Sequence, residues 1–261
     1  MIVEFSTFED LGFGGNPCPD YKKIRVHMVY AVKHDGRHKA RLVAGGHLME
    51  TPIDSIYSSV VSLRGVRLLT FVAELNDLEV WATDIGNAYL ESYTQEKVYI
   101  IAGPEFSDRQ GHTLVIRKAS YGLKSSGLCW HERLSNVLRD MGFIPSKAER
   151  DIWMHDCGDH YQYIAVYVDD LLIASKDPSS IIKTLSEEHK FKLKGIGAVS
   201  FHLGCDWFHD DNGNLCYVPH QHIEKVMDNY LCLFGKRPHN AHSPIVQGNH
   251  PELDTSELLD D

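Results

Sequence analysis

The sequence predicts an α+β fold in which an antiparallel sheet is backed by helices. Segments with strand character and segments with helical spacing of apolar residues follow one another without the regular alternation of a parallel α/β domain. Turn signals such as Asp35-Gly36 join neighbouring β segments directly, which makes those segments antiparallel partners. With 261 residues, 43% of them hydrophobic, the chain can bury a sizeable core.

The first half of the chain predicts a lead-in, a hairpin, a helix and several strands. Glycine and proline without apolar periodicity predict an irregular lead-in over residues 1–20. Apolar residues at helical spacing predict an amphipathic helix over Arg64 to Asn76. Strands are predicted where β-branched and aromatic residues gather: Ile24 to Val32, Lys39 to Ala44, Leu78 to Ile85, Val98 to Ile101 and Thr113 to Arg117.

The second half predicts two helices and two hairpins. One apolar face and the stop signal Gly142 predict a helix over Lys124 to Met141, and Asp177 before Pro178 predicts the start of another. The hairpin strands are expected at Tyr161 to Val168 with Leu171 to Ala174, and at Phe201 to Phe208 with Leu215 to Val218.

Charge is distributed unevenly along this acidic chain, whose formal net charge is -10. Basic side chains gather between Lys22 and Glu50 and again between Lys176 and Lys194, while residues 245–261 form an expected acidic tail. A basic groove for nucleic acid is therefore compatible with the composition. No run reaches the roughly 18 to 20 apolar residues of a membrane span, and the six cysteines include no close pair, so we expect an intracellular protein with reduced thiols and no membrane partner.

Asp169 and Asp170 are the most informative residues, because they interrupt a run that is otherwise almost entirely apolar. Adjacent carboxylates repel one another and are costly to desolvate, so a fold that holds them beside a buried sheet usually supplies a cation. Mg²⁺ prefers such oxygen ligands, and Mn²⁺ is the alternative. Asp84 ends another predicted strand and would join them if the strands pair. The alternative is structural: the pair forms a polar turn and Asp84 caps a helix.

Five short blocks occur in order along the chain: Lys39 to Ala44, Tyr121 to Lys124 with Trp130, Tyr167 to Asp170, Phe201 to Gly204, and Pro219 to Val226. They resemble the Lys-Ala-Arg-Leu-Val-Ala, Tyr-Gly-Leu-Lys-Gln-Ser-Pro-Arg-X-Trp, Tyr-X-Asp-Asp, Phe-Leu-Gly and Gln-X-X-Tyr-Ile blocks of copia-type LTR-retrotransposon reverse transcriptases. The resemblance implies the fingers and palm of a right-hand polymerase over residues 21–244, with the thumb absent or truncated. It implies an RNA-directed DNA polymerase.

The resemblance also implies a metal site and its ligands. Asp84 and Asp169 would bridge two metal ions, Asp170 would support the ion on the primer side, and Ile85 would be a further metal contact. The primer 3′-hydroxyl would attack the α-phosphate of an incoming deoxynucleoside triphosphate and displace pyrophosphate.

Four further residues are implied to bind the nucleotide. Tyr89 matches the aromatic residue that stacks under the sugar and excludes a 2′-hydroxyl. Lys39 and Arg41 match positions that touch the triphosphate, and Gly122 would let the backbone approach nucleotide and template. The structural alternatives are a core tyrosine, a solvated hairpin face and an ordinary turn.

The expected partners are a primed RNA or DNA template, deoxynucleoside triphosphates, and other Pol segments such as integrase and ribonuclease H. The chain departs from the family at Ser125 to Leu128, where Gln-Ser-Pro-Arg is usual. An alternative is therefore a catalytically impaired retroelement remnant that binds nucleic acid without polymerising. A nucleotidyl cyclase also sets carboxylates on a hairpin, but the blocks at Lys39 and Tyr121 argue against it.

Overall fold

The computed structural model describes residues 5–32, 36–46 and 58–240. Among these residues, no helix combines the length and the apolar character needed to cross a membrane. The expected acidic tail over 245–261 and residue Asp35 of the predicted turn lie outside the described residues.

Helices and strands alternate irregularly, which confirms the α+β class. The helical segments are α1 (Leu63–Leu75), η2 (Ala88–Glu91), η3 (Pro104–Arg109), α2 (Ser126–Asp140), α3 (Pro178–Lys183), the π-type turn η4 (Thr184–Glu188) and α4 (His220–Phe234). The strands are β1 (Phe8–Phe13), β2 (Lys22–Lys23), β3 (Val26–Val32), β4 (His38–Ala44), β5 (Glu79–Ile85), β6 (Val98–Ile101), β7 (His112–Ile116), β8 (Ile144–Pro145), β9 (Ile152–Asp156), β10 (Tyr161–Tyr167), β11 (Asp170–Ser175), β12 (Leu193–Ala198), β13 (Phe201–His202), β14 (Cys205–His209) and β15 (Leu215–Val218).

The central sheet has the strand order β12-β5-β11-β10-β9-β8, with neighbours antiparallel. Helices cover both of its faces. Leu171 and Ile173 of β11 pack in the core cluster that includes residues of α2 and α3, whereas Leu172 and Ala174 pack in the cluster that includes residues of α1. Because side chains alternate across a strand, burial of both faces explains why β10 and β11 read as almost continuous apolar runs.

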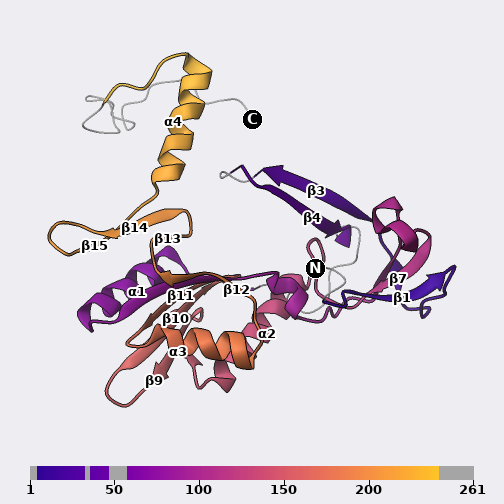
Figure 1. The fold of residues 1–261 in the computed structure, drawn as a ribbon, viewed down its shortest axis with the longest axis horizontal. Coiled ribbons are helices and arrows are strands. Elements are labelled where there is room, and N and C mark those ends of the chain that lie inside the picture. The colour runs from indigo at the N-terminus through magenta and orange to yellow at the C-terminus, as the bar shows by residue number, and fades with distance from the viewer. Residues whose placement is uncertain (1–4, 33–35, 47–57, 241–261) are drawn as a thin grey trace, which may run out of the picture.

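A second sheet, β1-β7-β6-β2, lies with the two-stranded hairpin β3–β4 at the other end of the molecule (Figure 1). The predicted irregular lead-in was wrong for residues 8–13. Phe8 pairs with Ile116 in the β1–β7 ladder, and its ring meets Phe106 edge-on at 5.5 Å between centroids. The strand forms because β7 offers it a free edge and Phe106 of η3 offers an aromatic contact, and neither partner can be recognised in the glycine-rich local sequence.

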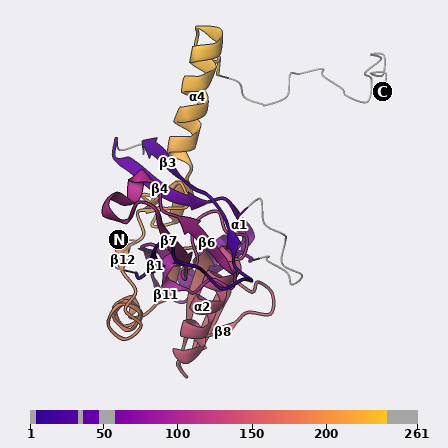
Figure 2. The same cartoon turned by 90° about the vertical axis from the view of Figure 1, so that its right-hand side faces the viewer.

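The third sheet, β13-β14-β15, leads into α4, which projects from the body in both views (Figures 1 and 2). None of the α4 residues is buried. The sequence pattern did not predict α4, β9 or β12. The β12 ladder is interrupted between Lys194 and Gly197, since two glycines with positive φ, Gly195 and Gly197, break its alternation.

Candidate active site

The three predicted acids meet where β5 and the β10–β11 hairpin lie side by side. Asp170 is opposite Asp84 in the antiparallel register of β11 and β5. The Ile85 amide, next along β5, donates a hydrogen bond to the Asp169 carbonyl at 2.8 Å. The two strands therefore pair as the convergence of the carboxylates requires, and Asp169 is held at the tip of the hairpin by its own backbone.

The hairpin tip has an unfavourable backbone that the core supports. Val168 has a φ of 58°, in the left-handed region where a β-branched side chain is costly. Its carbonyl accepts a 2.7 Å hydrogen bond from the indole N–H of Trp130. Trp130 is only 1% exposed, so this bond ties the tip to a fixed point on α2.

The carboxylates are half-buried and act on one another electrostatically. Burial raises the pKa of the Asp170 carboxyl to about 6, and the Asp169 and Asp84 carboxylates add to that rise. Burial also raises the pKa of the Asp169 carboxyl, and Asp84 contributes, while Lys39 and Arg41 oppose the rise. Two cations of the β3–β4 hairpin thus act on the acids of the central sheet.

The chemistry of these acids fits a hard divalent cation. The three carboxylates lie close together and half-buried, so their negative charges repel one another and are poorly solvated. A positive ion between them would offset both costs. As the side chains stand, no three histidine, cysteine, aspartate or glutamate residues in the described part of the chain form a ready ligand set. These three acids therefore suit a metal ion by residue type, by their place on neighbouring strands and by their charge. Their side chains would have to move into ligand geometry when the ion binds.

A cavity of about 760 Å³ lies between the acids and the hairpin β3–β4. Five of the residues that the sequence singled out line it together, namely Lys39, Arg41, Asp84, Tyr89 and Asp169. Acids from the central sheet and cations from a separate hairpin therefore border one space, although more than forty positions separate them in the sequence. This combination can hold a polyanion beside a pair of carboxylates of the kind that binds a hard cation.

Three predicted residues do not line this cavity. Ile85 is fully buried, and Asp170, opposite Asp84 in the strand ladder, is not among the lining residues. Gly122 has a φ of 91°, and a Cβ atom there would lie 2.0 Å from the Ala44 carbonyl oxygen. Gly122 thus permits close backbone packing against the end of β4. This favours a structural role for Gly122, as a turn residue, over contact with the nucleotide.

Two of the cavity residues that were not among the predicted site residues bear on its chemistry. Lys194 of β12 is opposite Asp84 in the β12–β5 register and lines the cavity. Tyr121 also lines it, and its ring meets the Tyr89 ring edge-on at 5.0 Å between centroids. Both carried a signal in the sequence, since Lys194 belongs to the second basic group and Tyr121 opens a family block, but nothing local placed them beside the acids.

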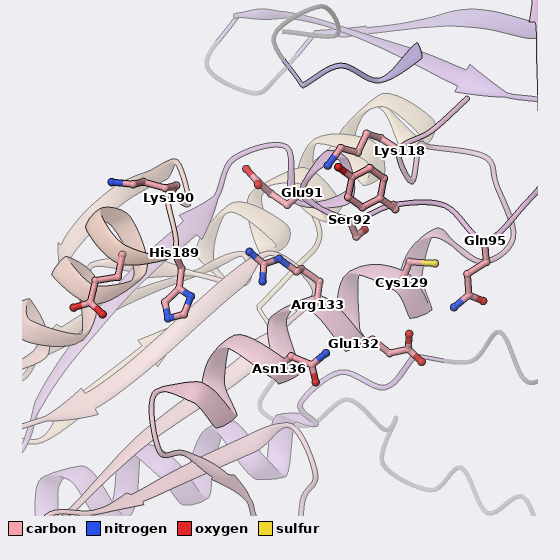
Figure 3. A pocket seen from close by; sticks show the side chains of 12 residues that line it. Glu91, Ser92, Gln95, Lys118, Cys129, Glu132, Arg133, Asn136, His189 and Lys190 are labelled. Atoms are coloured by element: carbon pink, nitrogen blue, oxygen red, sulfur yellow. The ribbon is translucent and has the colours of Figure 1, made fainter. Parts of the chain in front are cut away.

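A second cavity, of about 700 Å³, lies between the end of η2, α2 and the residues after η4 (Figure 3). Arg133 points into it beside Glu91 and His189. None of the predicted site residues lines it, and its three lysine or arginine side chains are matched by three glutamates. It has no net charge to attract a polyphosphate, so the cavity beside Asp84 is the candidate active site.

Comparison with known proteins gives one family. Residues 15–236 match the family described as "Reverse transcriptase (RNA-dependent DNA polymerase)". The chain is 31% identical over 175 residues to the retrovirus-related Pol polyprotein from transposon RE1 of Arabidopsis thaliana, covering 65% of this chain and 12% of the polyprotein. It is 30% identical over 200 residues to the corresponding polyprotein from transposon RE2 of the same plant, covering 73% of this chain and 14% of that one.

Among solved structures, a foamy viral protease-reverse transcriptase in complex with double-stranded DNA matches with a TM-score of 0.48 and 14% identity, covering 90% of this chain and 38% of that one. The chain spans about an eighth of the length of the two polyproteins. These relatives confirm the resemblance to copia-type transposons. The family match extends over most of the chain and includes Asp84 and Asp169, the two acids that line the cavity. The protein therefore belongs to the reverse transcriptase (RNA-dependent DNA polymerase) family.

Proposed function

We propose that this chain is the polymerase core of a retrotransposon Pol protein and adds deoxynucleotides to a primer 3′ end on an RNA template. The observation that carries the proposal is the single cavity bordered by Asp84 and Asp169 on one side and by Lys39 and Arg41 on the other. Nucleotidyl transfer needs this pairing, because the reacting phosphate must be held by cations while a metal-binding acid group lies within reach.

Asp84, Asp169 and Asp170 would hold Mg²⁺, with Mn²⁺ as the alternative, and Ile85 could contribute only through its backbone. When bound, the metal would lower the pKa of the attacking hydroxyl and stabilise negative charge on the phosphates. Arg41 would grip the triphosphate through its fork of N–H donors, and Lys39 would act as a point charge.

Tyr89 would discriminate between sugars. It lies in η2, next to the Asn87 residue whose φ of 61° turns the chain sharply after β5. Burial, with Tyr121 and Asp169 adding, raises the pKa of the Tyr89 hydroxyl above its ordinary value of 10.0. The ring therefore stays neutral and half-buried at the cavity wall, where it could stack under a deoxyribose and leave no room for a 2′-hydroxyl.

The remaining parts of the proposal concern the whole protein. Residues 21–244 would comprise fingers and palm, with the second sheet and the β3–β4 hairpin as fingers and the central sheet as palm. Template, primer and deoxynucleoside triphosphates would be the partners, and integrase and ribonuclease H would be other segments of the same Pol protein. An intracellular particle or the nucleus would be the place of action.

The departure at Ser125 to Leu128 is one ground for the remnant alternative, and the fold accommodates the first of these residues. The buried Ser125 donates from both its amide and its hydroxyl to the Glu96 carboxylate, at 2.8 and 2.9 Å. This link fastens the start of α2 to the segment before β6 without the usual glutamine. The change at Ser125 is thus compatible with a formed active site.

Primer extension on poly(rA)/oligo(dT) with Mg²⁺ or Mn²⁺ tests the proposal. The parent should extend the primer, Asp169→Asn should not, and Asp211→Asn, which changes an exposed turn acid, should match the parent. Circular dichroism would verify that each variant is folded. Folded parent protein that binds the primed template without extending it would refute the polymerase proposal and favour the remnant.

A further inference from the structure

Tyr121 touches two of the residues proposed to bind the nucleotide. Its ring meets Tyr89 edge-on, with centroids 5.0 Å apart and planes inclined by 65°. The guanidinium carbon of Arg41 lies 5.2 Å from the same ring's centroid. Tyr121 is 39% exposed and lines the cavity, so it stands between the proposed sugar contact and the proposed triphosphate contact.

The contact with Arg41 orients the guanidinium without using its hydrogen-bond donors. A ring face attracts a cation through its quadrupole, and arginine stacks on it while its N–H groups remain available. Within the described residues, the buried Nε atom of Arg41 has no hydrogen-bond acceptor. A phosphate oxygen would satisfy such a donor, whereas a carboxylate partner in place of the ring would compete with the phosphate.

The contact with Tyr89 fixes the ring proposed to face the sugar. Edge-to-face packing holds two aromatic rings at a defined inclination, and an aliphatic side chain would not specify that inclination. Tyr89 lies in a short 3-10 turn, where its carbonyl accepts hydrogen bonds from the amide and the hydroxyl of Ser92. These bonds hold the backbone, so the orientation of the ring depends on neighbours such as Tyr121.

The backbone of Tyr121 is in turn fixed to the β3–β4 hairpin. Its carbonyl accepts a 2.7 Å hydrogen bond from the Ala44 amide, and Gly122 packs directly on the Ala44 carbonyl. Ala44 ends the strand that carries Arg41. Tyr121 and Arg41 are therefore anchored to the same strand, while Tyr89 belongs to the segment that follows β5.

We propose that Tyr121 is a positioning residue whose ring orients both Arg41 and Tyr89. Binding of the triphosphate and discrimination against a 2′-hydroxyl would then depend on one aromatic ring. This inference rests on the nucleotide site proposed above. It assigns to Tyr121 a joint effect on two properties that separate residues would control independently.

The test compares Tyr121→Phe, which keeps the ring, with Tyr121→Leu, which removes it. Tyr93→Leu is the matched control, because Tyr93 also packs against a cation, with the Lys118 Nζ 3.9 Å from its ring centroid. Tyr93 lines the second cavity and not the one beside Asp84. We expect Tyr121→Leu to raise KM for dTTP about tenfold and to lower the preference for dTTP over ribothymidine triphosphate by a similar factor. Tyr121→Phe and Tyr93→Leu should stay within about twofold of the parent in both quantities.

A purely structural role would lower kcat or thermal stability in Tyr121→Leu and leave KM and the sugar preference unchanged, and that result would overturn the proposal. Calorimetric titration of dTTP into protein loaded with primer and template separates this inference from the polymerase function. If the parent binds dTTP without extending the primer, weaker binding in Tyr121→Leu alone would support the positioning role while the polymerase proposal failed. Equal affinity in all four proteins, or no binding to the parent, would overturn the positioning role.

Discussion

The hydrogen bond from Trp130 to the hairpin tip gives a prediction whose size follows from the structure. Trp130→Phe keeps an aromatic ring in the core but removes the N–H that donates to Val168 at 2.7 Å. The carbonyl then lacks its donor, which costs about 1–3 kcal/mol of unfolding free energy. The smaller ring costs about 1–2 kcal/mol more through lost packing.

Trp153→Phe separates these two contributions. Trp153 is 3% exposed and packs in the same core cluster, but within the described residues its indole donates to no residue of the hairpin. Urea denaturation should therefore show Trp130→Phe to be less stable than Trp153→Phe by about 1–3 kcal/mol.

The consequence for activity should be larger than the difference in stability. Val168, with its φ of 58°, loses the hydrogen bond from Trp130, so Asp169 next to it keeps only the bond from the Ile85 amide and is held less firmly. We expect kcat in primer extension to fall about ten- to a hundredfold in Trp130→Phe, measured well below the melting temperature, because small displacements of reacting groups have large effects on rate. Trp153→Phe should retain most of the parent's kcat. Equal stability and equal kcat in the two variants would refute the role given to this hydrogen bond.

Three other predictions concern the same site and its supports. Because the Asp170 carboxyl has a pKa raised to about 6, the folded state without metal should lose about 1–2 kcal/mol of stability as pH rises from about 4 to about 7. Asp170→Asn should reduce this loss in denaturation curves measured with EDTA, leaving the part that comes from the raised pKa of Asp169. Gly122→Ala should cost more than about 3 kcal/mol, whereas Gly213→Ala, with a φ of 81° and no atom within 4 Å of the added Cβ, should cost about 1 kcal/mol; similar melting temperatures for the two would contradict the clash. Ser125→Ala should lower the unfolding free energy by about 1–2 kcal/mol through the lost bond to Glu96, and an unchanged value would show that this bond is not stabilising.

Much of the fold could be predicted because the spacing of apolar residues in most segments matches the side of that helix or strand that the structure buries. The helices at Leu63 and Ser126, the acid hairpin and the strand that ends near Asp84 all form as predicted. Each has an apolar periodicity that matches its burial, and each is bounded by a residue that stops it. Strand β1 was missed since it depends on β7, and α4 lacks a buried face.

The sequence by itself determined the family, the α+β class and the identity of the acids, because these depend on residue types and their order along the chain. Only the tertiary structure decided which of the predicted residues share one space. It brings Lys39 and Arg41 to Asp84 and Asp169, places Gly122 in backbone packing, and puts Ile85 inside the core. It also decided the importance of Tyr121 and Trp130. Their contacts join segments far apart in the chain, and no local pattern specifies where a ring or an indole N–H will find its partner.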